Sequence, residues 1–372
     1  MSSLPEAAAS PSELTPPDPF APLVPLGWDD HRASSFVEHA AAGLSPGRVT
    51  RPGRGGHLLA TVDGPVLAVP SPRLNASVID STAMPTVGDW VAWASTDGGP
   101  AMVEAVLPRS SAFIRHTAGG DTRAQVLAAN VDVLLVAVAL TSPPNLRRLE
   151  RFLTLGWESG AQPVVLLTKS DVCDDVEEEV RYVEGAAPGV AVHALSSLTG
   201  DGVDALDRYL DGHSTLALLG TSGVGKSTLV NRLTGAPTME TSAIRDDGKG
   251  RHTTTHRELI PLPGGGVLID TPGLRGLQLW DADEGLERAF SDIEELAAGC
   301  RFPDCAHGSE PGCAVTAAIE AGTLPARRLD SYERLQRELA RLAGRQDARV
   351  RAEERKRWRT IAKAQRAHRP RP

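Results

Sequence analysis

A glycine-rich run in the middle of the chain constrains its fold more than any other feature. Its spacing is that of a loop that wraps around phosphate groups, and its residues are Gly220, Thr221, Ser222, Gly223, Val224, Gly225, Lys226, Ser227 and Thr228. An apolar stretch over 215–219 precedes the run and a helical pattern over 227–233 follows it, which gives the strand, loop and helix that such a site requires. The loop amides would face the phosphates, Lys226 would neutralise the β- and γ-phosphates, and Ser227 would bind magnesium.

A base-recognition motif precedes this loop, whereas in an ordinary GTPase the motif follows the loop. Its residues are Thr168, Lys169, Ser170 and Asp171. A fixed carboxylate at Asp171 can accept two hydrogen bonds from the edge of guanine, and adenine offers no matching pair of donors. The alkyl stem of Lys169 would pack over the ring. Beyond the next apolar stretch, Ser196 and Ser197 would add a backbone amide for the guanine oxygen.

A third motif, Asp270-Thr271-Pro272-Gly273, follows the phosphate loop. Asp270 would hold magnesium directly or through water, and the Gly273 amide would sense the γ-phosphate. All elements of a GTPase are therefore present, but in rotated order. The termini of compact domains usually lie close together, so a circular permutation can preserve the site.

Apolar stretches alternate with amphipathic helical stretches from about 125 to 279. This alternation predicts an α/β domain with a mostly parallel sheet, whose ligand loops lie at the carboxyl ends of the strands. The expected strands cover 131–140, 163–167, 190–195, 215–219, 258–262 and 267–269. A helix between the first two is predicted by the spacing of Leu146, Leu149, Phe152 and Leu153.

Short alternating apolar runs separated by Gly and Pro turns fill the region before this domain. They cover 57–62, 65–69, 89–93 and 102–106 and predict a small antiparallel barrel of the OB type. The exposed strand face of such a barrel often binds oligonucleotides. A barrel that serves only as a packing module is an equally open interpretation, because no stripe of aromatic and basic residues is visible.

The ends of the chain differ from its middle. We expect a disordered N-terminal extension over 1–45, a barrel over 46–115, the permuted GTPase domain over 116–280, a mainly helical zinc-binding domain over 281–344 and a basic helical tail over 345–372. Ser331 is expected to cap a helix with Tyr332, Leu335, Leu339 and Leu342 on one face. The N-terminus carries neither a basic start nor an apolar signal core, and no apolar run approaches the ~20 residues of a membrane span, so we expect a cytoplasmic protein.

The net charge of −8 conceals a basic tail. Residues 345–372 contain eleven Lys and Arg against three acidic residues. Such a tail on an acidic body suggests an electrostatic contact with RNA or another polyanion. A solvated helical tail without a partner is the alternative.

Three of the four cysteines crowd around one histidine: Cys300, Cys305, His307 and Cys313. An unsecreted chain gives no oxidising compartment for disulfides, so metal binding is the better interpretation. Three thiolates and one imidazole form a full tetrahedral set for a structural zinc ion, with no open position for chemistry. The alternative is three reduced cysteines and a surface histidine.

The rotated motif order, with a barrel in front and a Cys/His cluster behind, resembles the ribosome small-subunit-dependent GTPase family (RsgA/YjeQ). The resemblance runs from about 47 to 342 and includes the segments 87–91, 107–109, 128–132, 251–255 and 329–332. It implies GTP hydrolysis that is stimulated by the small ribosomal subunit during late maturation of that subunit. It also carries over all four zinc ligands.

The residue that orients the attacking water needs a substitute in this chain. Many GTPases use a Gln directly after the glycine of the third motif, but here that residue is Leu274. The resemblance suggests His252 instead, and the alternative is a solvated loop histidine. Thr254 is the preferred switch ligand for magnesium and the γ-phosphate, with Thr253 left open.

The leading interpretation is therefore a monomeric GTPase that binds GTP and GDP, magnesium, one zinc ion, the small ribosomal subunit and its rRNA, and no membrane. An RNA-binding assembly module with a regulatory nucleotide site and negligible turnover is the alternative. Another P-loop enzyme, such as an ATPase or kinase, is a third interpretation, which nucleotide competition would separate because Asp171 should select guanine.

Overall fold

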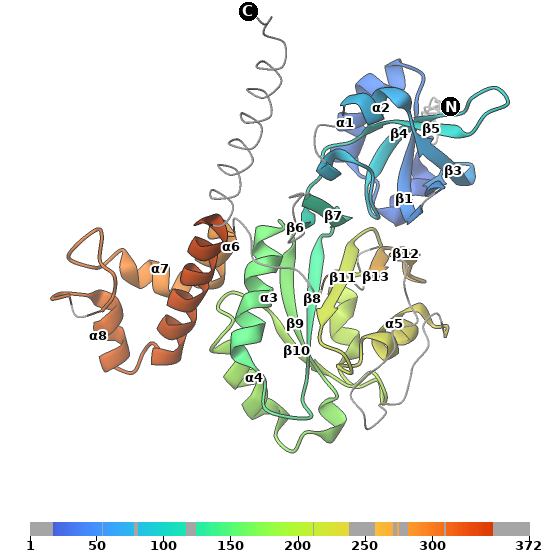
Figure 1. The fold of residues 1–372 in the computed structure, drawn as a ribbon. Coiled ribbons are helices and arrows are strands. Elements are labelled where there is room, and N and C mark those ends of the chain that lie inside the picture. The colour runs from blue at the N-terminus through green and yellow to red at the C-terminus, as the bar shows by residue number, and fades with distance from the viewer. Residues whose placement is uncertain are drawn as a thin grey trace, which may run out of the picture.

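The computed structural model describes residues 18–344 apart from 54, 78–80, 117–123, 211, 238–256, 271–273, 275–281 and 309. Three parts follow one another along the chain (Figure 1). A closed barrel is followed by a six-stranded sheet with helices on its faces and then by a group of helices beside α3.

The barrel has five strands that close in the order β1-β2-β3-β5-β4. Only the pair β3 and β5 is parallel among the paired strands of this barrel. The strands are β1 (Ser45–Gly53), β2 (Gly56–Thr61), β3 (Gly64–Pro70), β4 (Trp90–Ala94) and β5 (Ala101–Val106), with α2 (Pro72–Ser77) and η2 (Ser81–Ala83) between β3 and β4. This five-stranded arrangement confirms the predicted OB barrel.

The segment before the barrel contains η1 (Ala21–Leu26) and α1 (Asp30–Ala41). The expectation of a disordered extension through residue 45 is therefore wrong for residues 18–44. Asp29 caps α1 by accepting a hydrogen bond from the Arg32 amide. Trp28 and Phe36 pack against Trp90 of the barrel, with the two indole rings 4.9 Å apart, and this burial of aromatic area explains why the segment folds.

The central sheet has the order β10-β9-β8-β11-β13-β12, in which only β12 is antiparallel to its neighbour. Its strands are β8 (Val133–Ala139), β9 (Gln162–Thr168), β10 (Val192–Leu195), β11 (Thr215–Gly220), β12 (Glu258–Pro261) and β13 (Val267–Asp270). All six predicted strands are confirmed, with ends that differ by at most two residues. Because β11 lies between β8 and β13, the strand order reverses there, and ligands bind at such switch points.

Helices cover both faces of the sheet. Alternate strand residues point to opposite faces, so Leu134 and Leu135 of β8 belong to different core clusters. The predicted helix α3 (Leu146–Glu158) lies on one face with α4 (Val176–Glu184), and α5 (Lys226–Thr234) lies on the other with η4 (Val203–Tyr209).

A two-stranded sheet connects the barrel to the central sheet. It pairs β6 (Ala112–His116) with β7 (Ala124–Ala129), and neither strand was predicted. The fully buried Arg48 of β1 also joins the two parts. It donates hydrogen bonds to the carbonyls of Gly88 (3.3 Å) and Asn130 (3.3 Å) and to the hydroxyl of Thr215 (2.8 Å). Burial lowers the pKa of Arg48 to about 9. Since Thr215 begins β11, the barrel contacts the end of this strand opposite to the phosphate loop.

The C-terminal helices are α6 (Asp283–Ala289), α7 (Ser291–Ala297), α8 (Ala314–Glu320) and a helix over 326–344. The last helix starts directly after Pro325, so Ser331 lies inside it and the predicted cap is wrong. Tyr332, Leu335 and Leu339 do face the core as predicted. Within the described residues, no helix combines the length and the apolar character that crossing a bilayer requires.

Candidate functional site

The glycine-rich run forms the loop between β11 and α5. Gly223 and Gly225 have φ angles of 76° and 99°, in the left-handed region that favours glycine. The backbone N–H groups of residues 222–225 have no acceptor in the described part of the chain. The Lys226 ammonium donates to the carbonyls of Gly220 (2.8 Å) and Thr221 (2.7 Å). Free amides and a cation at the start of a helix are the features that bind phosphate groups.

The remaining residues of the run are placed around this loop. Val224 is buried, whereas Thr221 and Ser222 are exposed. Ser227 and Thr228 are half-buried in the first turn of α5. A hydroxyl in this turn is a suitable oxygen ligand for a magnesium ion that accompanies the phosphates.

The base-recognition motif begins at the end of β9, two strands away from the phosphate loop. Thr168 is buried, and its hydroxyl donates to the Val224 carbonyl in the phosphate loop at 2.6 Å. Lys169 follows in the left-handed conformation (φ 60°), and Ser170 and Asp171 begin the single turn η3 (Ser170–Val172). Thr168 therefore links two motifs, a role that the sequence analysis missed because it grouped this residue with the nucleotide contacts.

Ser196 and Ser197 follow β10, which pairs in parallel with β9. Ser196 is completely buried, and its hydroxyl accepts hydrogen bonds from the amides of Leu198 (3.3 Å) and Thr199 (3.2 Å). Its side chain thus builds the loop. The Ser197 N–H finds no acceptor among the described residues. This amide is available as the donor that the sequence analysis expects for the guanine oxygen.

The third motif begins at the end of β13, on the other side of β11. Asp270 is half-buried there, one strand away from the phosphate loop. Leu274 is 1% exposed and belongs to the core, so its side chain is not directed to solvent. Three other predicted site residues lie outside the described residues: His252, Thr254 and Gly273.

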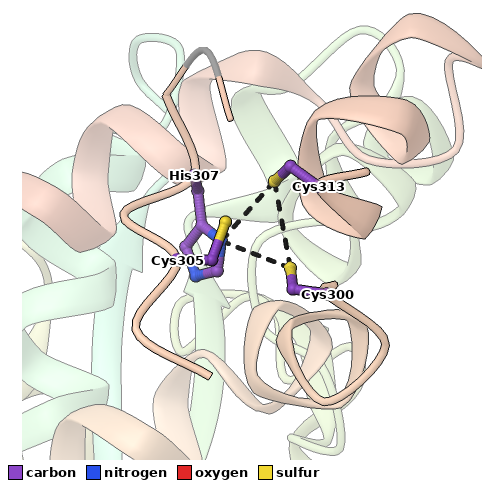
Figure 2. A group of neighbouring side chains, drawn as sticks. All are labelled: Cys300, Cys305, His307 and Cys313. Atoms are coloured by element: carbon purple, nitrogen blue, oxygen red, sulfur yellow. Dashed lines mark hydrogen bonds between the residues drawn. The ribbon is translucent and has the colours of Figure 1, made fainter. Parts of the chain in front are cut away.

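The Cys/His cluster lies in the loop between α7 and α8, and its four side chains point toward one another (Figure 2). Their ligand atoms all lie within 4.8 Å of one another. Cys300 Sγ is 3.7 Å from His307 Nδ1 and 3.9 Å from Cys313 Sγ, and Cys313 Sγ is 3.7 Å from His307 Nδ1. A tetrahedral zinc ion with Zn–S distances of about 2.3 Å requires ligand separations of about 3.8 Å. The residues present therefore fit zinc.

The environment of Cys313 favours the thiolate that a metal needs. Burial opposes ionisation of this thiol, but its hydrogen bonds with Thr316, His307 and Cys305 together outweigh burial and lower its pKa to about 6. Cys313 caps α8, and the Thr316 amide lies 3.4 Å from its sulfur. The helix start therefore stabilises a negative charge on this ligand.

The fold and the site together define a circularly permuted P-loop GTPase. If strand numbering started at β11, the order across the sheet from β12 to β10 would read 2-3-1-4-5-6. In this renumbered order, the strand that carries the base motif comes after the strands that carry the phosphate loop and Asp270. Along the chain, the same strand comes before them. The predicted permutation is confirmed.

Comparisons with known proteins agree with this class. The model of a family described as RsgA GTPase matches residues 106–280. A Streptomyces avermitilis protein named "Small ribosomal subunit biogenesis GTPase RsgA" is 50% identical over 365 residues, which cover 96% of this chain and 94% of the relative. A protein of the same name from Streptomyces coelicolor is 52% identical over 340 residues, which cover 90% and 92%.

Two solved structures have the same fold. The crystal structure of YjeQ from Thermotoga maritima gives a TM-score of 0.61 at 26% identity and covers 80% of this chain and 99% of that one. YloQ, described as a circularly permuted GTPase, gives 0.59 at 24% identity and covers 81% and 96%. The chain belongs to the RsgA GTPase family, as the sequence resemblance indicated.

Proposed function

We propose that this protein is a GTPase that acts in the biogenesis of the small ribosomal subunit. One observation carries the proposal: the carboxyl ends of β9, β10, β11 and β13 bring the phosphate loop, the base motif, the Ser197 amide and Asp270 to one edge of the sheet. The names of the relatives provide the process in which this site would act.

Individual roles follow from the chemistry of the side chains. Asp171 and the Ser197 amide recognise guanine, and Lys226 with the loop amides binds the phosphates. Ser227, Asp270 and Thr254 provide oxygen ligands for magnesium, directly or through water, and the ion neutralises the phosphate oxygens when it is bound. The Gly273 amide senses the γ-phosphate.

His252 is our candidate for orienting the attacking water. The burial of Leu274 in the core supports this assignment, because the residue at the usual glutamine position is directed away from solvent. We propose that contact with the small subunit positions His252 and thereby accelerates hydrolysis during late maturation.

The remaining partners follow from charge and metal chemistry. Eleven Lys and Arg in residues 345–372 favour contact with rRNA, and the Cys/His cluster would hold one structural zinc ion. We propose a cytoplasmic monomer. The alternative is an RNA-binding assembly module whose nucleotide site is regulatory.

GTP hydrolysis with and without small ribosomal subunits tests the proposal. We expect subunits to bind the GTP form in co-sedimentation and to stimulate GTP hydrolysis by the wild type. The stimulated rate of His252→Ala should be about 10²–10⁴-fold lower, which is the usual effect of removing such a group. His31→Ala, at an exposed histidine of α1, is the matched control. Full stimulated activity of His252→Ala would refute the role of His252. Negligible wild-type turnover in the presence of subunits would favour the RNA-binding module, and equal competition by ATP would favour another P-loop enzyme.

A further inference from the structure

Arg232, in the last turn of α5, contacts the loop that follows β10. Its guanidinium donates to three consecutive backbone carbonyls of that loop, those of Ser197 (3.2 Å), Leu198 (3.5 Å) and Thr199 (3.4 Å). Since α5 begins at the phosphate loop, one helix contacts both the phosphate half and the base half of the candidate site. Arg232 lies six positions after Lys226, which corresponds to about 9 Å along the helix.

Arg232 supports the outer side of a loop whose other hydrogen bonds, among the described residues, lie within the loop itself. On the inner side, the Ser196 hydroxyl accepts the amides of Leu198 and Thr199, and the Gly200 amide donates to the Ser196 carbonyl. The outer side faces solvent, and the Leu198 side chain is 77% exposed. Within the described part of the chain, no group other than Arg232 donates to the carbonyls of residues 197–199.

Gly200 allows this contact. Its φ angle is +101°, a conformation that other L-residues rarely adopt. A β-carbon at this position would overlap the guanidinium of Arg232. Gly200 thus provides both the left-handed backbone and the space in which Arg232 lies against the loop.

We infer that Arg232 is a positioning residue for guanine recognition. By holding the carbonyls of residues 197–199, it fixes the loop and keeps the Ser197 N–H in place relative to the phosphate loop. Because such a loop is already ordered before the nucleotide binds, binding does not have to include the entropy cost of ordering it, and the affinity is higher. The inference rests on the proposed function, because it assigns this amide to the guanine oxygen.

An ordinary role as a helix-end cation does not account for these contacts. A cation in the last turn of a helix is favourable wherever it points. The helix α4, which like α5 has nine residues, also carries an arginine in its last turn, Arg181. Both arginines are exposed, but Arg181 lies 4.0 Å from Glu177 on its own helix, so this pair contacts no second element. Arg181→Ala is therefore the matched control.

The test compares the binding of GDP, IDP and ADP by competition with a fluorescent GDP. Guanine and hypoxanthine share the oxygen at C6, whereas adenine carries an amino group there. Arg232→Ala should raise the Kd for GDP and IDP by about tenfold and leave the Kd for ADP within twofold. Arg232→Lys, which keeps a cation, should stay within about threefold of wild type, and Arg181→Ala should match wild type. The kcat at saturating GTP should stay within twofold, because the phosphate loop is unchanged.

Two comparisons separate this inference from the proposed function. The guanine site itself is tested by two measurements. The wild type should bind GDP more tightly than ADP, and Asp171→Asn should lose more affinity for GDP than for IDP. Given that result, an unchanged Kd for GDP in Arg232→Ala overturns the inference. An equal rise for GDP and ADP also overturns it, since that would be a general structural effect. Two further variants extend the test. Arg232→Lys keeps a cation in α5, and Gly200→Ala displaces the guanidinium without changing α5.

Discussion

At the scale of single residues, Thr168 shows how a motif residue can act through another motif. The sequence places it beside Lys169 and Asp171, and the structure buries its side chain under the phosphate loop. Its hydroxyl donates to the Val224 carbonyl at 2.6 Å. A hydrogen bond of this kind keeps the base motif and the phosphate loop in a constant relative position.

Replacing Thr168 by valine should weaken nucleotide binding. The variant keeps the side-chain shape but leaves the buried Val224 carbonyl without this donor, which costs about 1–3 kcal/mol. We expect the Kd for GDP to rise about tenfold in a fluorescence titration. Thr154→Val is the control, because the Thr154 hydroxyl is equally buried and donates to the Glu150 carbonyl (3.0 Å) within α3. A similar loss of GDP affinity in both variants would contradict a specific role of Thr168.

At the scale of elements, the loop between α7 and α8 depends on its four ligand side chains. The loop has few apolar residues of its own, and Phe302 in it is 40% exposed. Cys313 both caps α8 and contributes a sulfur to the cluster. A metal in this cluster would therefore hold the end of one helix to the start of the next.

Removing the metal should loosen this loop without affecting the nucleotide site. We expect one zinc ion per chain in the wild type by elemental analysis and none in Cys305→Ser. Strong chelators should lower the Tm of the wild type, and the Kd for GDP should remain within twofold. Cys173→Ser, at a half-buried cysteine outside the cluster, should retain the zinc. Zinc retained at full occupancy in Cys305→Ser would show that the cluster is not the binding site.

The sequence predicts those elements best whose pattern is local. The strands β8, β9, β11 and β13 are buried apolar runs, and all six strands of the central sheet are correctly predicted. The strand β7 is rich in alanine and has only one β-branched residue, Val126, so its pattern does not distinguish it from a helix. The segment over 18–44 was missed because the disorder indicated by the Pro- and Ser-rich residues 1–19 was extended to residue 45. The aromatic residues Phe20, Trp28 and Phe36 are the signal that identifies the segment.

In the site, too, the residues with a local pattern are the ones that could be predicted. Motif residues and zinc ligands are recognisable because their chemistry requires a fixed spacing. Arg232 and Gly200 lie far apart in sequence and meet only because α5 and β10 are brought together by the sheet. Contacts of this kind depend on the tertiary structure and have no local signature.

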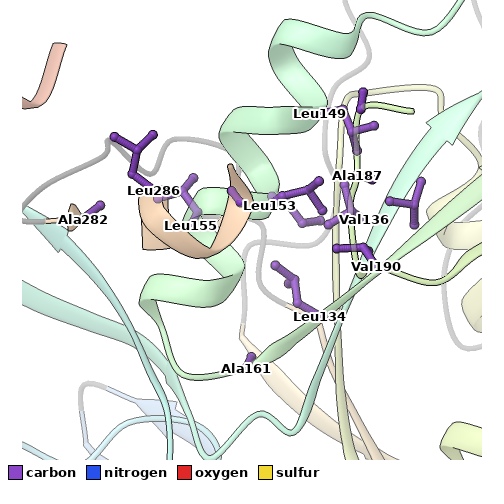
Figure 3. Close-up of a cluster of buried hydrophobic side chains, with 14 of the residues drawn as sticks. Leu134, Val136, Leu149, Leu153, Leu155, Ala161, Ala187, Val190, Ala282 and Leu286 are labelled. Carbon is purple, nitrogen blue, oxygen red and sulfur yellow. The ribbon is translucent and has the colours of Figure 1, made fainter. Parts of the chain in front are cut away.

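At the scale of the whole molecule, the C-terminal helices share a core with the GTPase domain. Figure 3 shows Leu153 of α3 toward the sheet residues Leu134 and Val136, and Leu155 of the same helix beside Leu286 of α6. A buried ion cluster crosses the same boundary. Arg328 is completely buried and pairs with Glu150 of α3 (3.0 Å) and with Asp292 of α7 (2.6 Å).

Replacing Arg328 by methionine should destabilise this boundary strongly. The change leaves Glu150, which is 1% exposed, without its cation, and breaking a buried pair in this way costs about 3–5 kcal/mol. Urea denaturation of Arg328→Met should show this loss, and adding Glu150→Gln should restore part of it. Arg337→Met is the control on the same helix, because the ion pair of Arg337 with Glu333 (3.7 Å) is exposed. Its loss should cost less than about 1 kcal/mol. Equal destabilisation by both variants would refute the role of the buried cluster.

The position of β11 between β8 and β13 has a mechanical consequence. The chain enters the sheet from the barrel through β8 and leaves it toward the C-terminal helices through β13, and both strands are parallel to β11. A force that pulls the barrel and the C-terminal helices apart therefore loads both hydrogen-bond ladders of β11 in shear. The strand that carries the phosphate loop therefore joins, through its two ladders, the strand by which the chain enters the sheet and the strand by which it leaves.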